Sequence, residues 1–78
     1  MASAEHITQA ESHVQEAILR ISRQQALVDG LERSGREKEA ARARELLQTF
    51  RDTLRVASEH LRIERDNLRI GRGNDLNS

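Results

Sequence analysis

The fold is decided by the stretch VDGLERSGREKEAARARELL, residues 28–47, in which Ser34-Gly35 separates two segments with the same seven-residue repeat. Up to Val28, β-branched residues recur at every seventh position: Ile7, Val14, Ile21 and Val28. After the glycine, leucine recurs in the same way: Leu47, Leu54, Leu61 and Leu68. A seven-residue apolar repeat is typical of helices that pack along one seam. Two such segments joined by one turn predict an all-α fold, a coiled-coil-like antiparallel hairpin of two helices.

The composition around this repeat sets the expected boundaries. We expect the first helix over about residues 3–33, a turn over about 34–35 and a second helix over about 36–70. These elements form one hairpin over residues 1–70. Residues 71–78 contain two glycines and several short polar side chains, so we expect a flexible C-terminal tail there.

Two places in the sequence are suited to the turn. A turn at Asp29-Gly30 would leave Leu31 outside the core, whereas a turn at Gly35 keeps both apolar repeats intact. Glycine also suits the left-handed position that often ends a helix, so we favour Gly35. At the other end, Ser3 is the expected N-cap of the first helix.

Folding at Gly35 predicts which residues meet across the seam. The expected layers are Leu31 with Ala40, Val28 with Ala43, Gln24 with Leu47, Ile21 with Phe50, Ala17 with Leu54, Val14 with Ala57, Ala10 with Leu61 and Ile7 with Glu64. Five layers place alanine opposite a larger residue, which lets two helices approach closely at nearly constant volume per layer. We interpret Gln24 as a polar core residue that sets the register, with simple exposure at the edge of the seam as the alternative.

Composition excludes several classes of function. The 13 basic and 13 acidic residues cancel, which argues against a nucleic-acid partner. No apolar run approaches the ~20 residues that span a bilayer, and the N-terminus lacks the features of a signal peptide, so we expect no membrane partner and a cytoplasmic location. With no cysteine, the 78 residues cannot form disulfides, and so short a chain has a thin core. Self-association is the simplest further source of burial.

A second apolar line on the second helix points to an interface. Val56, Ile63 and Ile70 lie about 160–200° around the helix from the leucine line, where the first helix cannot cover them. Uncovered apolar surface usually marks an interaction site, so we expect two hairpins to dock here as a homodimer, a four-helix bundle. An unknown protein partner is the alternative, and the opposite flank is expected to be charged. The expected interface residues are Leu27, Leu46, Thr53, Val56, His60, Ile63 and Ile70.

The histidines are the candidate site for metal chemistry. The antiparallel register places His13 and His60 across one seam, where Glu16 or Glu64 could complete a zinc site. No two histidines have the i,i+3 or i,i+4 spacing that is usual for metal pairs within a helix. We therefore interpret them as polar residues at a dimer edge, with a pH switch as a further alternative. No catalytic, cofactor-binding or metal-binding residue is assigned, and we expect no enzyme.

The expected function is a non-enzymatic helical protein–protein interaction or adaptor module. The alternative is a small regulator of two-component signalling, either phosphatase-like or phosphotransfer. Residues 58–62, Ser-Glu-His-Leu-Arg, resemble the phosphoacceptor helix of dimeric sensor kinases, although the acid precedes His60 here. Ser12 and Glu16 resemble the serine and aspartate, four apart, of hairpins that dephosphorylate response regulators.

Part of the chain also resembles a family of natural proteins. The residues that carry the resemblance are Arg23-Gln24, Ala26-Leu27-Val28, Leu31-Glu32, Gly35, Leu46-Leu47-Gln48-Thr49-Phe50, Thr53-Leu54 and His60. Over residues 23–60 the chain is similar to a group of short, uncharacterised bacterial proteins. The resemblance implies a helical hairpin and no particular activity. The chain departs from the group after the turn, where Arg36-Glu37-Lys38 replaces a capping aspartate or threonine.

Overall fold

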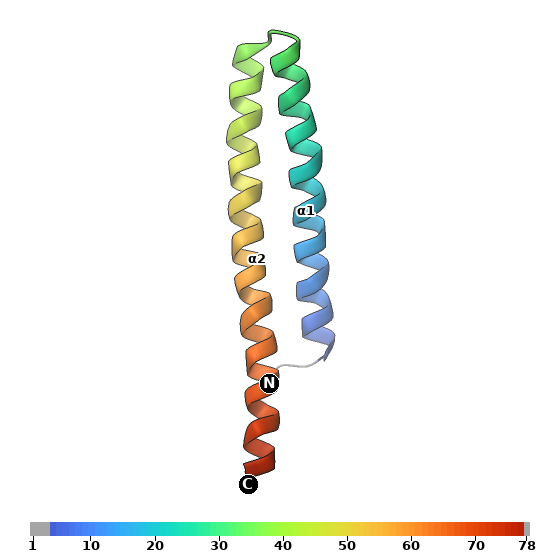
Figure 1. Ribbon diagram of the computed structural model, residues 1–78, viewed down its shortest axis with the longest axis vertical. Coiled ribbons are helices and arrows are strands. Elements are labelled where there is room, and N and C mark those ends of the chain that lie inside the picture. Colours follow the sequence, from blue (N-terminus) through green and yellow to red (C-terminus); the bar gives the residue numbers. More distant parts are fainter. Residues whose placement is uncertain (1–3, 78) are drawn as a thin grey trace.

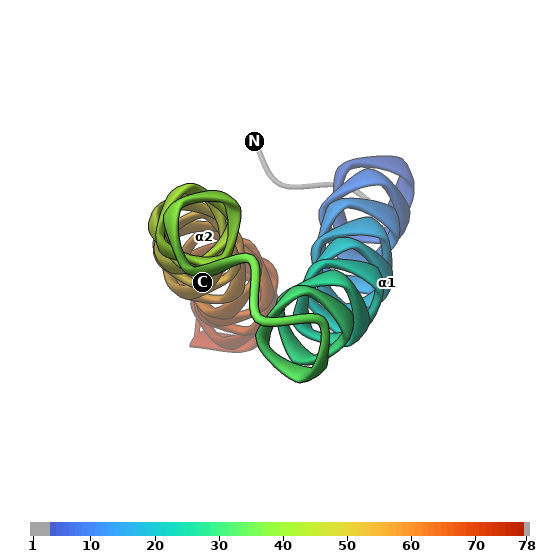
Figure 2. The ribbon, with the colours of Figure 1, turned by 90° about the horizontal axis from the view of Figure 1, so that it is seen from above.

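The computed structural model describes the backbone of residues 4–77 and the side chains of residues 5–68. Helix α1 spans Ala4–Arg33 and helix α2 spans Glu37–Asn77. The two helices lie side by side and run in opposite directions, as seen in Figure 1 and, from above, in Figure 2. The principal extents are 64 × 15 × 13 Å, which describe a rod. The predicted all-α antiparallel hairpin is confirmed.

The turn lies at Gly35, as the sequence predicts. Gly35 has a φ of +75°, whereas no other residue in the described backbone has a positive φ. The Gly35 N–H donates to the Glu32 carbonyl (3.1 Å), and the Arg36 N–H donates to the Leu31 carbonyl (3.0 Å). These two bonds form a Schellman motif, which satisfies the carbonyls that the last turn of a helix leaves free. The Ser34 hydroxyl adds a 2.8 Å bond to the Gly30 carbonyl.

Helix α2 begins without a side-chain cap. The carbonyl of Arg36 accepts the first helical bond, from the Ala40 N–H at 2.8 Å, so Arg36 occupies the N-cap position. A guanidinium has no acceptor oxygen and cannot bind the free N–H groups of the first turn. Glu37 and Glu39 partly compensate, because acidic residues interact favourably with the positive end of the helix dipole.

The core follows the predicted layers closely. Every residue of the eight layers is buried or half-buried, and the seven that are fully buried are Ala10, Ala17, Gln24, Val28, Ala40, Ala43 and Leu47. Val28, Ala43 and Leu47 form a central cluster with Ile21 and Leu31 packed against it. That cluster lies in the half of the hairpin next to the turn. In the other half, the large layer residues are only half-buried.

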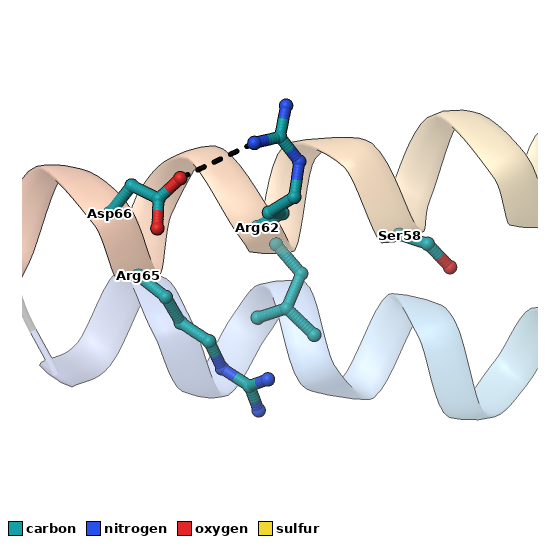
Figure 3. A pocket seen from close by; sticks show the side chains of 5 residues that line it. Ser58, Arg62, Arg65 and Asp66 are labelled. Carbon is teal, nitrogen blue, oxygen red and sulfur yellow. Dashed lines mark hydrogen bonds and ion pairs between the residues drawn. The ribbon is translucent and has the colours of Figure 1, made fainter.

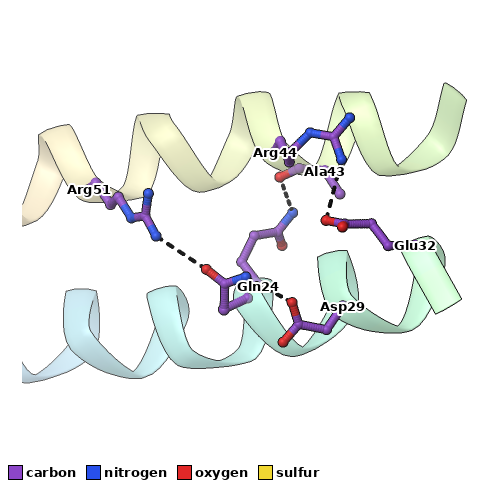
Figure 4. Close-up of polar contacts among 7 residues, drawn as sticks. Gln24, Asp29, Glu32, Ala43, Arg44 and Arg51 are labelled. Atoms are coloured by element: carbon purple, nitrogen blue, oxygen red, sulfur yellow. Dashed lines mark hydrogen bonds and ion pairs between the residues drawn. The ribbon is translucent and has the colours of Figure 1, made fainter. Parts of the chain in front are cut away.

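Gln24 is the polar member of the core, and its amide makes a specific contact. Its Nε2 donates to the Ala43 carbonyl at 2.9 Å across the seam, as Figure 4 shows. Among the described side chains, no buried nitrogen or oxygen lacks a hydrogen-bond partner. The bond fixes one turn of α1 against one turn of α2, in agreement with the interpretation of Gln24 as a register-setting residue.

The ends of the chain differ from the expectation in one respect. Helix α2 continues to Asn77, whereas the sequence predicts an end near residue 70 and a tail over 71–78. Glycine costs about 1 kcal/mol in a helix relative to alanine but does not block the hydrogen bonds, and the segment contains no proline. The predicted N-cap, Ser3, lies outside the described residues, as does Ser78. Within the described residues, neither helix has a stretch long and apolar enough to cross a membrane.

Candidate docking surface

Six of the seven predicted interface residues lie on one exposed surface. Leu27 comes from the last turns of α1, and the others come from α2. Exposed fractions are 50% for Leu27, 45% for Leu46, 64% for Val56 and 44% for Ile63. We call this surface the docking strip, and its members are Leu27, Leu46, Thr53, Val56, His60 and Ile63. The seventh predicted residue, Ile70, lies outside the residues whose side chains are described.

The threonines of this surface contribute methyl groups rather than free hydroxyls. The Thr53 hydroxyl donates to the Thr49 carbonyl at 3.0 Å, and the Thr49 hydroxyl donates to the Glu45 carbonyl at 3.3 Å. Both bonds return to the preceding turn of the same helix. Because the polar groups are satisfied within α2, the docking strip stays apolar between Leu46 and Val56.

A hollow lined by histidines lies beside the docking strip. Its volume is about 230 Å³, and its lining residues are His6, Gln9, Ala10, His13, His60 and Glu64. The structure therefore brings His13 and His60 to one place, as the register predicts, and adds His6. The His60 Nε2 lies 3.8 Å from the Glu64 carboxylate. Among the described residues, however, no three donor side chains are placed so that they could hold one metal ion.

The opposite flank carries a ladder of arginines from α2. Arg44 binds Glu32 at 3.3 Å, Arg51 donates to the Gln25 side chain at 3.2 Å, and Arg65 lies 3.9 Å from Glu11. Figure 4 shows the first two contacts. From one contact to the next, each step of seven or fourteen residues along α2 matches an equal step back along α1. The ladder therefore reports a constant antiparallel register along the hairpin.

The ladder has one gap, whose consequence was not predicted from the sequence. Between Arg51 and Arg65 the next position seven residues along α2 is Ser58, and the corresponding position on α1 is Ile18. Neither side chain is charged, and Ile18 is 44% exposed. A hollow of about 510 Å³ opens there, lined by Ser58, Leu61, Arg62, Arg65 and Asp66 (Figure 3). The flank expected to be charged thus contains an apolar residue. Leu19, 53% exposed on the outer face of α1, was also not predicted as a surface feature. The adjacent Ile18-Leu19 pair, outside the core positions, was the available signal.

An acidic row borders the docking strip on α2, and its members are Glu45, Asp52, Glu59 and Asp66. Arginines of the same helix form ion pairs with three of them. Arg62 contacts both Glu59 and Asp66, and Arg55 lies 3.7 Å from Asp52. The hydrogen bond and the charge of Arg62 lower the pKa of the Glu59 carboxyl, and Glu59 raises the pKa of Arg62 in return. Both groups are exposed, so these pairs shape the surface charge more than they stabilise the fold.

Comparison with known proteins assigns no role to this surface. Comparison with protein-family models, with curated proteins and with solved structures finds no match for this chain. The resemblance to short bacterial hairpin proteins over residues 23–60 therefore stays a prediction from the sequence, and the docking strip is the feature from which a function can be inferred.

Proposed function

We propose that this chain is a non-enzymatic helical protein–protein interaction or adaptor module that uses the docking strip to bind its partner. The observation that carries the proposal is the exposure of Val56 and Ile63, which lie one heptad apart on the same face of α2. Full burial of one such side chain is worth about 1.5–3 kcal/mol relative to leaving it exposed. Because Val56 is 64% and Ile63 is 44% exposed, burying what remains of both offers a partner about 2–3 kcal/mol. Micromolar binding needs about 8 kcal/mol, so the other strip residues and the polar edges must contribute as well.

The shape of the surface fits recognition by another helix. The docking strip is long and narrow, and its residues recur at the three- and four-residue spacing of a helix face. Helical partners commonly bind in this way, with apolar anchors along a groove or face and polar groups at its edges. The acidic row on α2 supplies such a polar edge.

The experiment is a comparison of two charge insertions in cells that naturally make the protein. A double variant, Val56→Glu with Ile63→Glu, changes the docking strip, and Leu19→Glu is the matched control on an exposed apolar residue elsewhere. After chemical crosslinking, we expect wild type and Leu19→Glu to give the same crosslinked species and the double variant to lose them. Equal crosslinking by all three proteins, with helicity unchanged, would contradict the proposal.

The alternative function, a regulator of two-component signalling, is supported by one feature of α2. The His60 imidazole is exposed and lies beside the Glu64 carboxylate, an arrangement open to a phosphoryl donor. Replacing Glu16 separates the two functions, because a docking module keeps its partner in Glu16→Gln whereas a phosphatase-like hairpin loses activity. His60→Gln similarly abolishes phosphorylation by a sensor-kinase donor if the histidine is a phosphoacceptor.

A further inference from the structure

The two edges of the docking strip carry opposite charges. On α2 the edge is the acidic row, whose members at heptad spacing are Glu45, Asp52, Glu59 and Asp66. On α1 the corresponding row holds His6, His13, Arg20 and Leu27. Arg23 lies next to this row and adds a second fixed positive charge, whereas Glu16 is an acidic residue on the same edge. The surface is thus apolar in its centre and acidic along one side, whereas the other side carries the positive charges of Arg20 and Arg23 against the single negative charge of Glu16.

The opposite charges lie at matching heights along the hairpin. The core layers set the register, and on it Arg20 of α1 lies level with Asp52 of α2. One heptad further from the turn, His13 lies level with Glu59. The fixed opposite charges that lie at one height are thus Arg20 and Asp52, and at the next height a polar imidazole lies level with a carboxylate.

We propose that a second copy of this chain covers the docking strip, related to the first by a two-fold axis parallel to the long axis of the hairpin. This inference rests on the proposed function, since it names the partner of that same surface. A parallel axis places each edge against the opposite edge of the other copy at the same height. Asp52 of one copy then faces Arg20 of the other, and the reverse contact forms by symmetry.

The alternative orientation fails on charge. A two-fold axis perpendicular to the hairpin places the acidic row of one copy against the acidic row of the other, because the two edges are not exchanged. Like charges brought together across an interface oppose association and suppress that geometry. The exposed ion pairs of Arg55 with Asp52 and of Arg62 with Glu59 and Asp66 reduce this repulsion without removing it. Charge complementarity therefore selects parallel hairpins, with both turns at the same end.

The surface area of the isolated hairpin agrees with this pairing. Its accessible surface is 6074 Å², and its mass is 8.9 kDa. A compact monomer of that mass exposes about 4,800 Å², so the hairpin carries roughly 1,300 Å² more than a compact fold would. A standard interface buries about 800 Å² on each partner. The excess follows from the rod shape, and it is large enough to supply the area that one copy docked along the strip would bury.

The backbone of α2 independently favours the parallel orientation. Figure 1 shows that the last turns of α2 extend beyond the first turn of α1, so α1 does not accompany them. A helix segment of only a few turns that packs against no other helix is marginally stable in water. Parallel hairpins bring the two extensions side by side, whereas antiparallel hairpins would leave them at opposite ends of the dimer.

The test uses single cysteines, because the natural chain has none. In the parallel dimer, Val56 and Ile63 each lie near the same residue of the other copy, so both Val56→Cys and Ile63→Cys form disulfide dimers. The two positions are about 10 Å apart along α2. In an antiparallel dimer at least one of them is then too far from its own copy for a disulfide, which needs Cα atoms within about 7 Å. Leu19→Cys, whose exposed fraction of 53% lies between those of Val56 and Ile63 but which is off the strip, is the control and stays monomeric.

A charge exchange gives the second readout, the dissociation constant of the uncrosslinked protein. Arg20→Asp and Asp52→Arg should each weaken the dimer by about tenfold or more, and their combination should restore it, because the exchanged charges again face each other. Disulfide dimers at only one of the two cysteine positions would overturn the parallel dimer and leave the docking function intact. So would a combined Arg20→Asp and Asp52→Arg variant whose dissociation constant is not restored. A folded wild type that is monomeric at high concentration would overturn the second copy as partner. The crosslinking comparison with Val56→Glu and Ile63→Glu then decides whether the surface binds another protein or none.

Discussion

Gly30 and Gly35 lie five residues apart, and the same substitution should have opposite effects at the two positions. Gly30 has an ordinary helical conformation in α1, and a Cβ added there meets no atom within 4 Å. A Cβ added at Gly35 also meets no atom within 4 Å, but the φ of +75° at Gly35 lies in the left-handed region. Neither site is short of space for a methyl group, so the backbone conformation decides the sign of the effect, which makes Gly30→Ala and Gly35→Ala a matched pair.

The expected magnitudes follow from this difference. Alanine is favoured over glycine by about 0.8–1.0 kcal/mol inside a helix, so Gly30→Ala should stabilise the hairpin by about 1 kcal/mol. At Gly35 the left-handed conformation costs alanine about 1–2 kcal/mol, and the smaller entropy of the unfolded chain returns about 0.4–1 kcal/mol. Gly35→Ala should therefore destabilise by about 1 kcal/mol. For a domain of this size, 1 kcal/mol corresponds to a change of about 4–8 °C in Tm.

Thermal unfolding followed by circular dichroism measures both changes. All proteins must be compared at one concentration, because self-association raises Tm as concentration increases. We expect Tm to rise for Gly30→Ala and to fall for Gly35→Ala, with the double variant close to wild type. The reverse signs would show that the chain turns at Gly30, and the core layers would then be wrong. Equal changes of the same sign would refute the conformational difference between the two glycines.

Three further predictions concern α2, the core and the surface charges. Arg36→Asp should raise the free energy of unfolding by about 1 kcal/mol, because aspartate at the N-cap accepts hydrogen bonds from the free N–H groups and arginine cannot. Chemical denaturation measures this free energy, and Arg36→Ala is the control. Gln24→Leu should leave the free energy of unfolding unchanged or raise it, because the Ala43 carbonyl keeps its hydrogen bond within α2. The register of the two helices should become less specific, and light scattering would detect this as a mixture of assemblies. Arg62→Gln should return the lowered pKa of Glu59 to the ordinary range, as carboxyl NMR titration measures. The contribution of the Arg62–Glu59 pair to stability is present at pH values above the ordinary range of the carboxyl, and it is lost as the pH falls through the lowered pKa.

The core was predictable because its signal is periodic. Each residue of the predicted layers belongs to a seven-residue repeat, so an error at one position changes little in the whole pattern. The choice between two turns depended on Leu31, which only the turn at Gly35 keeps inside the core, and the structure places Leu31 against the central cluster. The same reasoning located the exposed residues of the docking strip, because a residue far around the helix from the seam cannot be covered by one partner helix.

Features that do not repeat at a regular spacing along the sequence were not predicted. The end of α2 depends on the balance between glycine's cost and helix propagation, and composition alone suggested an earlier stop. The long arginine side chains of the ladder reach residues beyond those at their own height, such as Glu11 for Arg65, and spacing does not reveal which acceptor such a flexible side chain will choose. Ile18, 44% exposed on a flank expected to be charged, belongs to neither apolar repeat, so the periodic pattern did not draw attention to it.

Stability and docking are linked in this hairpin through its alanines. Small residues let α1 and α2 approach closely, but they bury little apolar area, so large residues such as Leu54 and Leu61 stay half-buried in the half away from the turn. Val56, the most exposed apolar residue of the docking strip, and Ile63 belong to that same half. A partner bound there adds burial where the hairpin has least of its own. The part of the molecule that recognises a partner is therefore also the part whose packing the partner completes, so binding and ordering of this half should occur together.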